Sequence, residues 1–130
     1  MRRVNIPTKK QSPKNIQEQI VSELDKLKAE NIVIIDLKGK SSIADYMIIA
    51  AGSSSRHINS MAQKIIEFFK IHKIINISVE GLQKSDWILI DTGDILLHLF
   101  KQETREFYNL EKMWIQKKGD SETIMIGNDI

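Results

Sequence analysis

The stretch Ser85–Trp114, SDWILIDTGDILLHLFKQETREFYNLEKMW, carries more aromatic area than a solvated surface needs and more charge than a core needs. Within it, two apolar runs, Trp87–Ile90 and Ile95–Phe100, flank the turn sequence Asp91-Thr92-Gly93-Asp94. Apolar runs of this length around such a turn predict a β-hairpin. We therefore expect this stretch to hold part of the core and also the surface that meets a partner.

Alternation along the hairpin separates its residues into two faces. A turn that pairs Ile90 with Ile95 sets Trp87 opposite His98. One face is wholly apolar and predicts core: Ile88, Ile90, Ile95, Leu97 and Leu99. The other face is mixed: Trp87, Leu89, Asp91, Asp94, Leu96, His98 and Phe100. The mixed face is the better place to look for function.

Upstream of the hairpin, helical patterns alternate with β-rich runs. A serine cap followed by proline at Ser12-Pro13 opens an amphipathic pattern at Ile16, Ile20, Leu24 and Leu27, and a second pattern covers Ile58–Phe69. The β-rich runs are Ile32–Leu37, Tyr46–Ala51 and Ile74–Val79. Together with the hairpin, these predict an α/β fold with a five-stranded sheet and helices packed on it, including a βαβ unit.

The chain of 130 residues has the length of one domain. We expect a flexible basic arm over residues 1–12, a single α/β domain over 13–114 and a loose tail over 115–130. In that tail, Ile124–Ile126 adds at most weakly to a sheet edge.

Charge is divided unevenly along the chain. Five positive charges precede Glu18, which leaves residues 15–130 at −3 of the total of +2. A slightly acidic body argues against nucleic-acid binding by the domain, and leaves only the arm to touch RNA by phosphate neutralisation. A solvated terminus is the commoner role for such an arm.

Several other classes are excluded by composition. Without cysteine there is no disulfide, thiol catalysis or thiolate metal site. The N-terminus lacks the apolar run of a secretory signal, and no run elsewhere is long enough to span a bilayer, so we expect a cytoplasmic protein with no membrane contact.

Two patterns raise the possibility of enzyme chemistry. Asp91 and Asp94 flank a turn and could share a divalent cation, as paired carboxylates do in nucleotidyltransferases. Gly52–His57 lies between a strand and a helix, where free amides can hold a phosphate. Each has a commoner explanation, because aspartate favours turns and serine favours helix N-caps, which leaves Arg56 and His57 as exposed contact candidates.

The last part of the opening stretch, Thr104–Trp114, suits either of two roles. Phe107, Leu110 and Trp114 would close the core at the edge of the sheet. Arg105, Tyr108, Glu111 and Trp114 would form a binding surface, since tyrosine, tryptophan and arginine supply most interface hot spots. His98 beside an indole is more typical of an interface or a structural residue than of a general base.

Taken together, the order and spacing of these motifs resemble one family, over about Ile16 to Trp114. The motifs are Asp45-Tyr46, Gly52-Ser53-Ser54-Ser55-Arg56-His57, Glu80-Gly81, Asp86-Trp87, Asp91-Thr92-Gly93-Asp94, His98, Arg105 and Phe107-Tyr108-Asn109-Leu110-Glu111-Lys112-Met113-Trp114. The chain resembles the ribosomal silencing factor family, also called Iojap-like. The resemblance implies a mixed sheet with nucleotidyltransferase-like topology but without that active site.

The resemblance also implies a non-enzymatic role without cofactor or metal. Its members bind the large ribosomal subunit through universal protein number fourteen, block joining of the small subunit and lower translation when nutrients are scarce. When free, they can be homodimers. Carried onto this chain, and with the neighbouring candidates added, the partner-binding residues are Trp87, Ile88, His98, Arg105, Tyr108, Leu110, Glu111 and Trp114. Ile88 conflicts with the strand register, which buries its side chain.

Two alternatives belong to other classes. One is a magnesium-dependent enzyme of nucleotidyltransferase type that uses Asp91, Asp94 and the Gly52–His57 turn. The other is an RNA-binding accessory protein that works through its basic arm, with ribosomal RNA as a minor contact. The first requires turnover or nucleotide binding, and the second requires the arm for ribosome binding.

Overall fold

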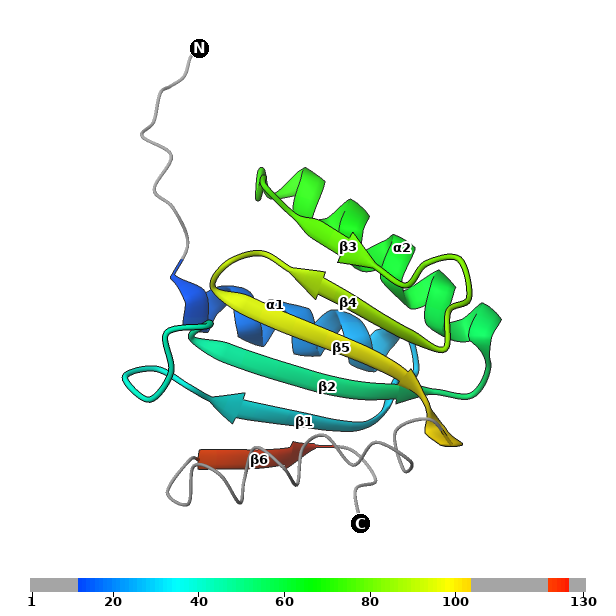
Figure 1. The fold of residues 1–130 in the computed structure, drawn as a ribbon, viewed down its shortest axis with the longest axis horizontal. Coiled ribbons are helices and arrows are strands. Elements are labelled where there is room, and N and C mark those ends of the chain that lie inside the picture. The colour runs from blue at the N-terminus through cyan, green and yellow to red at the C-terminus, as the bar shows by residue number, and fades with distance from the viewer. Residues whose placement is uncertain (1–11, 104–121, 127–130) are drawn as a thin grey trace.

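The computed structural model describes residues 12–103 and 122–126. Two helices and six strands follow in the order shown in Figure 1. The helices are α1 (Pro13–Lys26) and α2 (Ser55–Ile71). The strands are β1 (Glu30–Asp36), β2 (Tyr46–Gly52), β3 (Ser78–Glu80), β4 (Trp87–Asp91), β5 (Ile95–Lys101) and β6 (Glu122–Ile126).

All six strands form one mixed sheet in the order β3-β4-β5-β2-β1-β6. β2 and β5 run parallel in the middle of it, and the other neighbouring pairs are antiparallel. The predicted α/β fold with a mixed five-stranded sheet and helices is confirmed. β6 adds a further strand at the β1 edge, where the sequence indicated only weak pairing.

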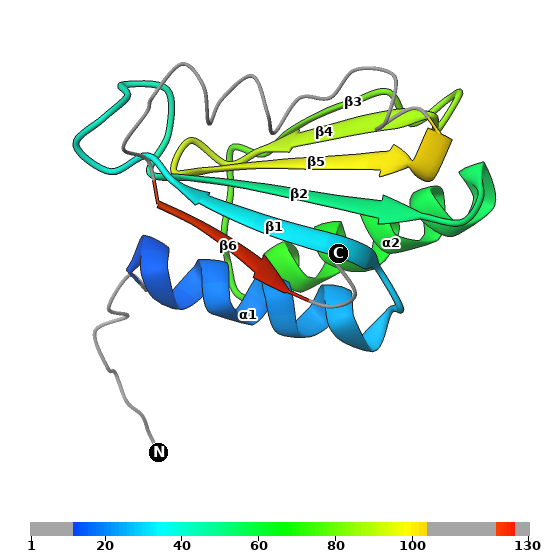
Figure 2. The same cartoon turned by 90° about the horizontal axis from the view of Figure 1, so that it is seen from below.

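Both helices cover the same face of the sheet, as Figure 2 shows. Their apolar stripes and the helix-side residues of the strands form one core. The central contacts come from fully buried Ile20, Leu24, Ile58, Met61, Ile65 and Phe69 on the helices. The predicted apolar hairpin face, Ile88, Ile90, Ile95, Leu97 and Leu99, lies entirely in this core. We call this the helix face.

The opposite face of the sheet has its own, smaller apolar cluster, which we call the open face. Its buried members are Val33, Ile35, Leu37, Ala44, Met47, Ile49, Leu96 and Phe100, with Leu89 packed against them. Within residues 12–103 no helix packs on this side. The same strands therefore contribute to two apolar layers, of which only one lies against described helices.

The hairpin register differs from the prediction by two residues. Ile90 pairs with Leu97, and Trp87 pairs with Phe100. The reason lies in the turn, where the Thr92 amide donates to the Ile95 carbonyl (3.0 Å). Because a shift of two residues preserves the alternation, each side chain stays on its predicted face.

The third strand is shorter than the predicted run Ile74–Val79, because only Ser78–Glu80 pairs. Lys73 and Asn76 have φ angles of 58° and 63°, in the left-handed region that interrupts an extended chain. Ile75, between them, is 73% exposed rather than buried. The crossover from β2 through α2 therefore ends in a short edge strand.

Candidate functional site

The open face carries an aromatic cluster where β4 and β5 meet. Trp87 and Phe100 are paired across the strands, and their rings stack with centroids 4.9 Å apart. Trp87 is 36% exposed, whereas Phe100 beneath it is fully buried. The indole therefore rests on a fixed aromatic base and presents the rest of its surface outward.

His98 fixes the polar edge of the same indole. Trp87 Nε1 donates a hydrogen bond to His98 Nδ1 at 3.1 Å. Nδ1 must then be an acceptor, which places the proton of the neutral ring on Nε2. Burial lowers the pKa of His98 from 6.5 to about 4, because desolvation disfavours the imidazolium form. Near neutral pH the His98 ring is therefore uncharged and holds the indole of Trp87 by this hydrogen bond.

The structure places the proposed contact residues at different depths. Trp87 is partly exposed, and His98 retains only 7% exposure. Ile88 is fully buried in the helix-face core, so its side chain does not reach the surface, as its register position predicted. The other candidates, Arg105, Tyr108, Leu110, Glu111 and Trp114, lie outside the described residues.

The Gly52–His57 turn is a helix cap, as the commoner explanation predicted. Ser54 Oγ accepts the His57 amide at 3.0 Å. Gly52 is required by close packing, because an added Cβ would lie 2.8 Å from Ile58 Cγ1. Arg56 is exposed, in agreement with its role as a contact candidate.

His57 is not the exposed contact residue that was expected. The Ser53 amide donates to His57 Nδ1 at 3.0 Å, and Nε2 lies 2.8 Å from the Leu27 carbonyl oxygen. Since a carbonyl only accepts, Nε2 donates. Nδ1 thus closes the turn before α2, Nε2 joins α2 to the end of α1, and the role is structural.

At the hairpin turn, the side chain of Asp91 and the backbone of Asp94 have structural roles. Asp91 Oδ1 accepts the Gly93 amide at 2.8 Å, as expected for an aspartate that stabilises its own turn. The Asp94 carbonyl accepts the amides of Asp45 and Tyr46, which joins the turn to the start of β2. Among the described residues, no three histidines or acids are grouped to hold a metal ion.

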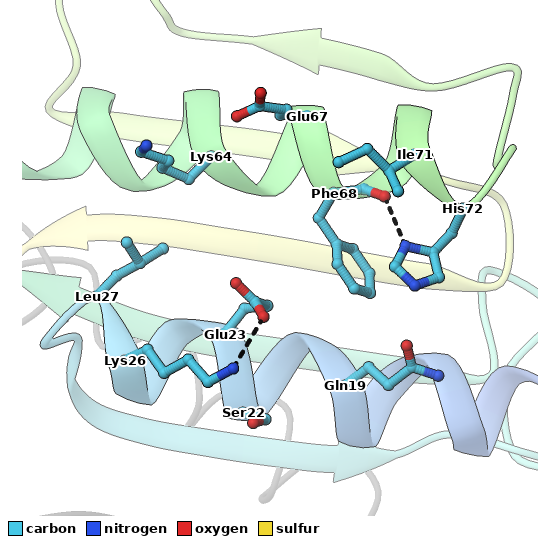
Figure 3. Close-up of a pocket in the computed structure, with 10 residues that line it drawn as sticks. All are labelled: Gln19, Ser22, Glu23, Lys26, Leu27, Lys64, Glu67, Phe68, Ile71 and His72. Carbon is cyan, nitrogen blue, oxygen red and sulfur yellow. Dashed lines mark hydrogen bonds and ion pairs between the residues drawn. The ribbon is translucent and has the colours of Figure 1, made fainter.

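Two hollows mark the surface of the described part. One, of about 550 Å³, adjoins the aromatic cluster and is lined by Val79, Gly81, Leu82, Gln83, Lys84, Asp86 and Trp87. The other, of about 480 Å³, lies between α1 and α2 (Figure 3). Figure 3 shows that the second is bordered by the Lys26–Glu23 ion pair and by His72, whose Nδ1 lies 2.9 Å from the Phe68 carbonyl oxygen. The first is the one that shares a wall with Trp87.

Comparison with known proteins settles the class. The family described as ribosomal silencing factor during starvation matches residues 9–129. The chain belongs to the ribosomal silencing factor family. The family match extends beyond Ile16–Trp114 at both ends, so it includes most of the tail. Members of this family are ribosome-binding factors rather than enzymes, and the alternative of a nucleotidyltransferase-like enzyme is set aside.

Individual relatives agree with the family match. A ribosomal silencing factor of Zymomonas mobilis is 48% identical over 102 residues, covering 78% of this chain and 77% of that protein. One from Haemophilus influenzae is 41% identical over 97 residues, covering 75% and 95%. A mouse protein named mitochondrial assembly of ribosomal large subunit protein 1 is 31% identical and is covered over 49% of its length, against 84% of this chain.

The fold is also found in a solved relative. A crystal structure of a protein from Chromobacterium violaceum superposes with a TM-score of 0.76 at 26% identity, covering 80% of this chain and 87% of that one. Among the described residues, no helix is long and apolar enough to cross a membrane. In this chain, the fold is a sheet with both described helices on one face and the aromatic cluster on its open face.

Sequence reasoning missed two parts of the site. Phe100 was assigned to the mixed face but not recognised as the base under Trp87, because the predicted register paired Trp87 with His98. The loop between β3 and β4 was passed over as well, although Gly81 and Ser85 at its ends are signals of a tight connection.

Proposed function

We propose that this silencing factor binds the large ribosomal subunit through universal protein number fourteen, with Trp87 as the central anchor, and so prevents the small subunit from joining. The observation that carries the proposal is the partly exposed indole held between Phe100 and His98 on the open face. Translation would be lowered in this way when nutrients are scarce, and the family description, ribosomal silencing factor during starvation, supports this role.

The chemistry of the cluster suits a protein partner. Tryptophan is among the strongest contributors to interface energy, and a rigid side chain loses little entropy when it is covered. Stacking and the indole hydrogen bond remove much of the freedom of Trp87 before any partner arrives. A preorganised anchor of this kind makes binding tighter without adding contacts.

Electrostatics favour a basic partner. Residues 15–130 carry a net charge of −3, and ribosomal proteins are mostly basic. Complementary charge mainly raises the rate of encounter and suppresses wrong partners. An RNA partner for the folded body is disfavoured by the same sign of charge.

Steric exclusion is sufficient for the block. A compact domain of this length is roughly 35 to 40 Å across, so on an intersubunit surface it excludes the other subunit by its volume alone. A specific protein contact needs about 800 Å² on each partner. The open face offers an anchor for such a contact while the helices stay on the far side.

Co-sedimentation of Trp87→Ala with purified large subunits tests the proposal. Loss of a central tryptophan should weaken binding about thirtyfold or more, the effect of a hot-spot truncation. Subunit joining should recover in parallel, measured by the fraction of joined ribosomes in a sucrose gradient. Ile71→Ala is the matched control, because this 69% exposed residue at the end of α2 loses apolar surface on the helix side.

The affinity of Trp87→Ala shows whether Trp87 contributes to binding of the large subunit. If folded Trp87→Ala binds large subunits as tightly as the wild type, the open face is not the docking surface. If the wild type itself fails to bind large subunits, the proposed function fails.

A further inference from the structure

The loop between β3 and β4 determines how Trp87 is presented, because Trp87 is the first residue of β4. Gly81 turns the chain with a φ angle of 92°, and a Cβ added there would overlap the carbonyl oxygen of Trp87. The loop therefore folds back directly against the backbone from which the indole projects. No side chain larger than hydrogen fits at this turn without moving that backbone.

Ser85 closes this loop two residues before the tryptophan. Its amide donates to the Gly81 carbonyl at 2.9 Å, and its hydroxyl donates to the Leu82 carbonyl at 2.7 Å. It is 4% exposed and holds a φ angle of 57°, an uncommon conformation for a residue with a side chain. Such a conformation persists where neighbouring contacts enforce it.

A further contact on Ser85 comes from helix α2. Asn59 Nδ2 donates both to the Ser85 hydroxyl at 2.9 Å and to the Leu82 carbonyl at 3.2 Å. A carbonyl cannot donate, so the amide nitrogen, rather than its oxygen, must face the loop. One side chain thus joins the helix to both ends of the turn.

We propose that Asn59 is a positioning residue for ribosome docking: its amide, acting through Ser85 and the Gly81 turn, holds the backbone of Trp87 and the hollow beside it in the binding-competent shape. The inference rests on the proposed function and names a residue that acts through the β3–β4 loop. Trp87 is then fixed twice, at its indole by His98 and at its backbone by Asn59.

The expected consequence is a loss of preorganisation. Without the amide, the Ser85 hydroxyl loses a donor and the loop samples other conformations, so part of the binding free energy is spent on ordering it. One hydrogen-bonded tie of this kind corresponds to a weakening of about fivefold to tenfold. The weakening caused by loss of the Asn59 amide should vanish when Trp87, the residue that Asn59 positions, is absent.

A double-mutant cycle measures this dependence. Affinity for large subunits is determined for the wild type, Asn59→Ala, Trp87→Ala and the double variant. Asn59→Ala should weaken binding by the stated factor in the wild-type background and have no further effect in the Trp87→Ala background. Ser60→Ala, an exposed neighbour on α2, is the matched control and should leave affinity unchanged.

Equal weakening by Asn59→Ala in both backgrounds would show a general structural role and overturn the proposal. So would no weakening in either. Asn59→Asp keeps the size of the side chain but cannot donate, so it should behave like Asn59→Ala. Full affinity in Asn59→Asp would also contradict the inference, because the tie consists of donated hydrogen bonds.

A readout on the free protein separates this inference from the proposed function. In a Trp114→Phe background the fluorescence reports Trp87 alone. Asn59→Ala should increase quenching of that fluorescence by acrylamide, whereas Ser60→Ala should not. Failure of the wild type to bind large subunits would end the proposed function, and unchanged quenching in Asn59→Ala would end the positioning role.

Discussion

The two faces of the sheet are built from alternate residues of the same strands, yet they bury different kinds of side chain. On the helix face, Ile88 and Leu99 pair across β4 and β5 beneath helices and are fully buried. On the open face, the adjacent positions hold His98 and the partly exposed Trp87. One register thus serves both a core and the proposed binding surface.

The difference lies in how polar groups are satisfied. The buried helix-face residues of β4 and β5 are all apolar: Ile88, Ile90, Ile95, Leu97 and Leu99. The open face contains a buried imidazole, which is tolerable because its Nδ1 receives the indole hydrogen. Polarity on this face is retained where it orients a partly exposed aromatic ring, which supports the proposal that this face binds the partner.

The largest expected effect is a loss of stability when a core residue of the helix face is truncated. Ile88→Ala should lower the free energy of unfolding by about 2 to 5 kcal/mol, through lost burial and the cavity left behind. Leu89→Ala, its half-buried neighbour on the open face, should cost less. Urea denaturation measures both. Folded Ile88→Ala should still bind large subunits, and a stable variant without binding would instead make Ile88 a contact.

Acid should weaken the open face selectively. The pKa of His98 is about 4 when folded and 6.5 in the unfolded chain, so the unfolded state binds more protons in between. Stability is therefore fully present above about pH 6.5 and is lost as the pH falls towards 4, by up to about 3 kcal/mol. His98→Asn does not titrate there, and urea midpoints between pH 7 and 4 should fall less for it. Equal falls would refute the assignment.

Period-two alternation is why the two faces could be predicted from sequence. The hairpin register was wrong by two residues, but a shift of two leaves every side chain on its side. The helix caps were likewise predictable, because Ser12 and Ser54 accept amides three residues ahead of themselves. These features depend on local chemistry alone.

Contacts between distant segments were not predictable. The shortening of β3 is a separate, local effect, and Asn76 was a signal for it, because asparagine adopts the left-handed conformation more readily than most residues and is depleted in strands. Two of the hydrogen-bonded ties from α2, by His57 to Leu27 and by Asn59 to Ser85, join residues 30 and 26 positions apart. No spacing rule connects such pairs.

A smaller loss of stability is expected when the hydrogen bonds of His57, on the helix side, are removed. His57→Ala loses two hydrogen bonds, one to the Leu27 carbonyl and one from the Ser53 amide, and should cost about 1 to 2 kcal/mol of stability. Thermal unfolding measures the loss. Affinity for large subunits should not change, since this tie lies away from Trp87. A loss of affinity at full stability would place His57 in the docking surface after all.

The smallest expected effects come from the two helix caps. Ser54→Ala removes the acceptor for the His57 amide and should cost about 1 kcal/mol, because α2 packs against the centre of the sheet. Ser12→Ala removes the matching acceptor at the exposed start of α1, where water can replace it, and should cost less. Urea denaturation of both variants measures the difference. Neither cap serine is hydrogen-bonded to Trp87 or His98, so neither change should alter the hydrogen bond between them, and a shifted indole ¹H–¹⁵N signal of Trp87 would show that the cap is coupled to the aromatic cluster.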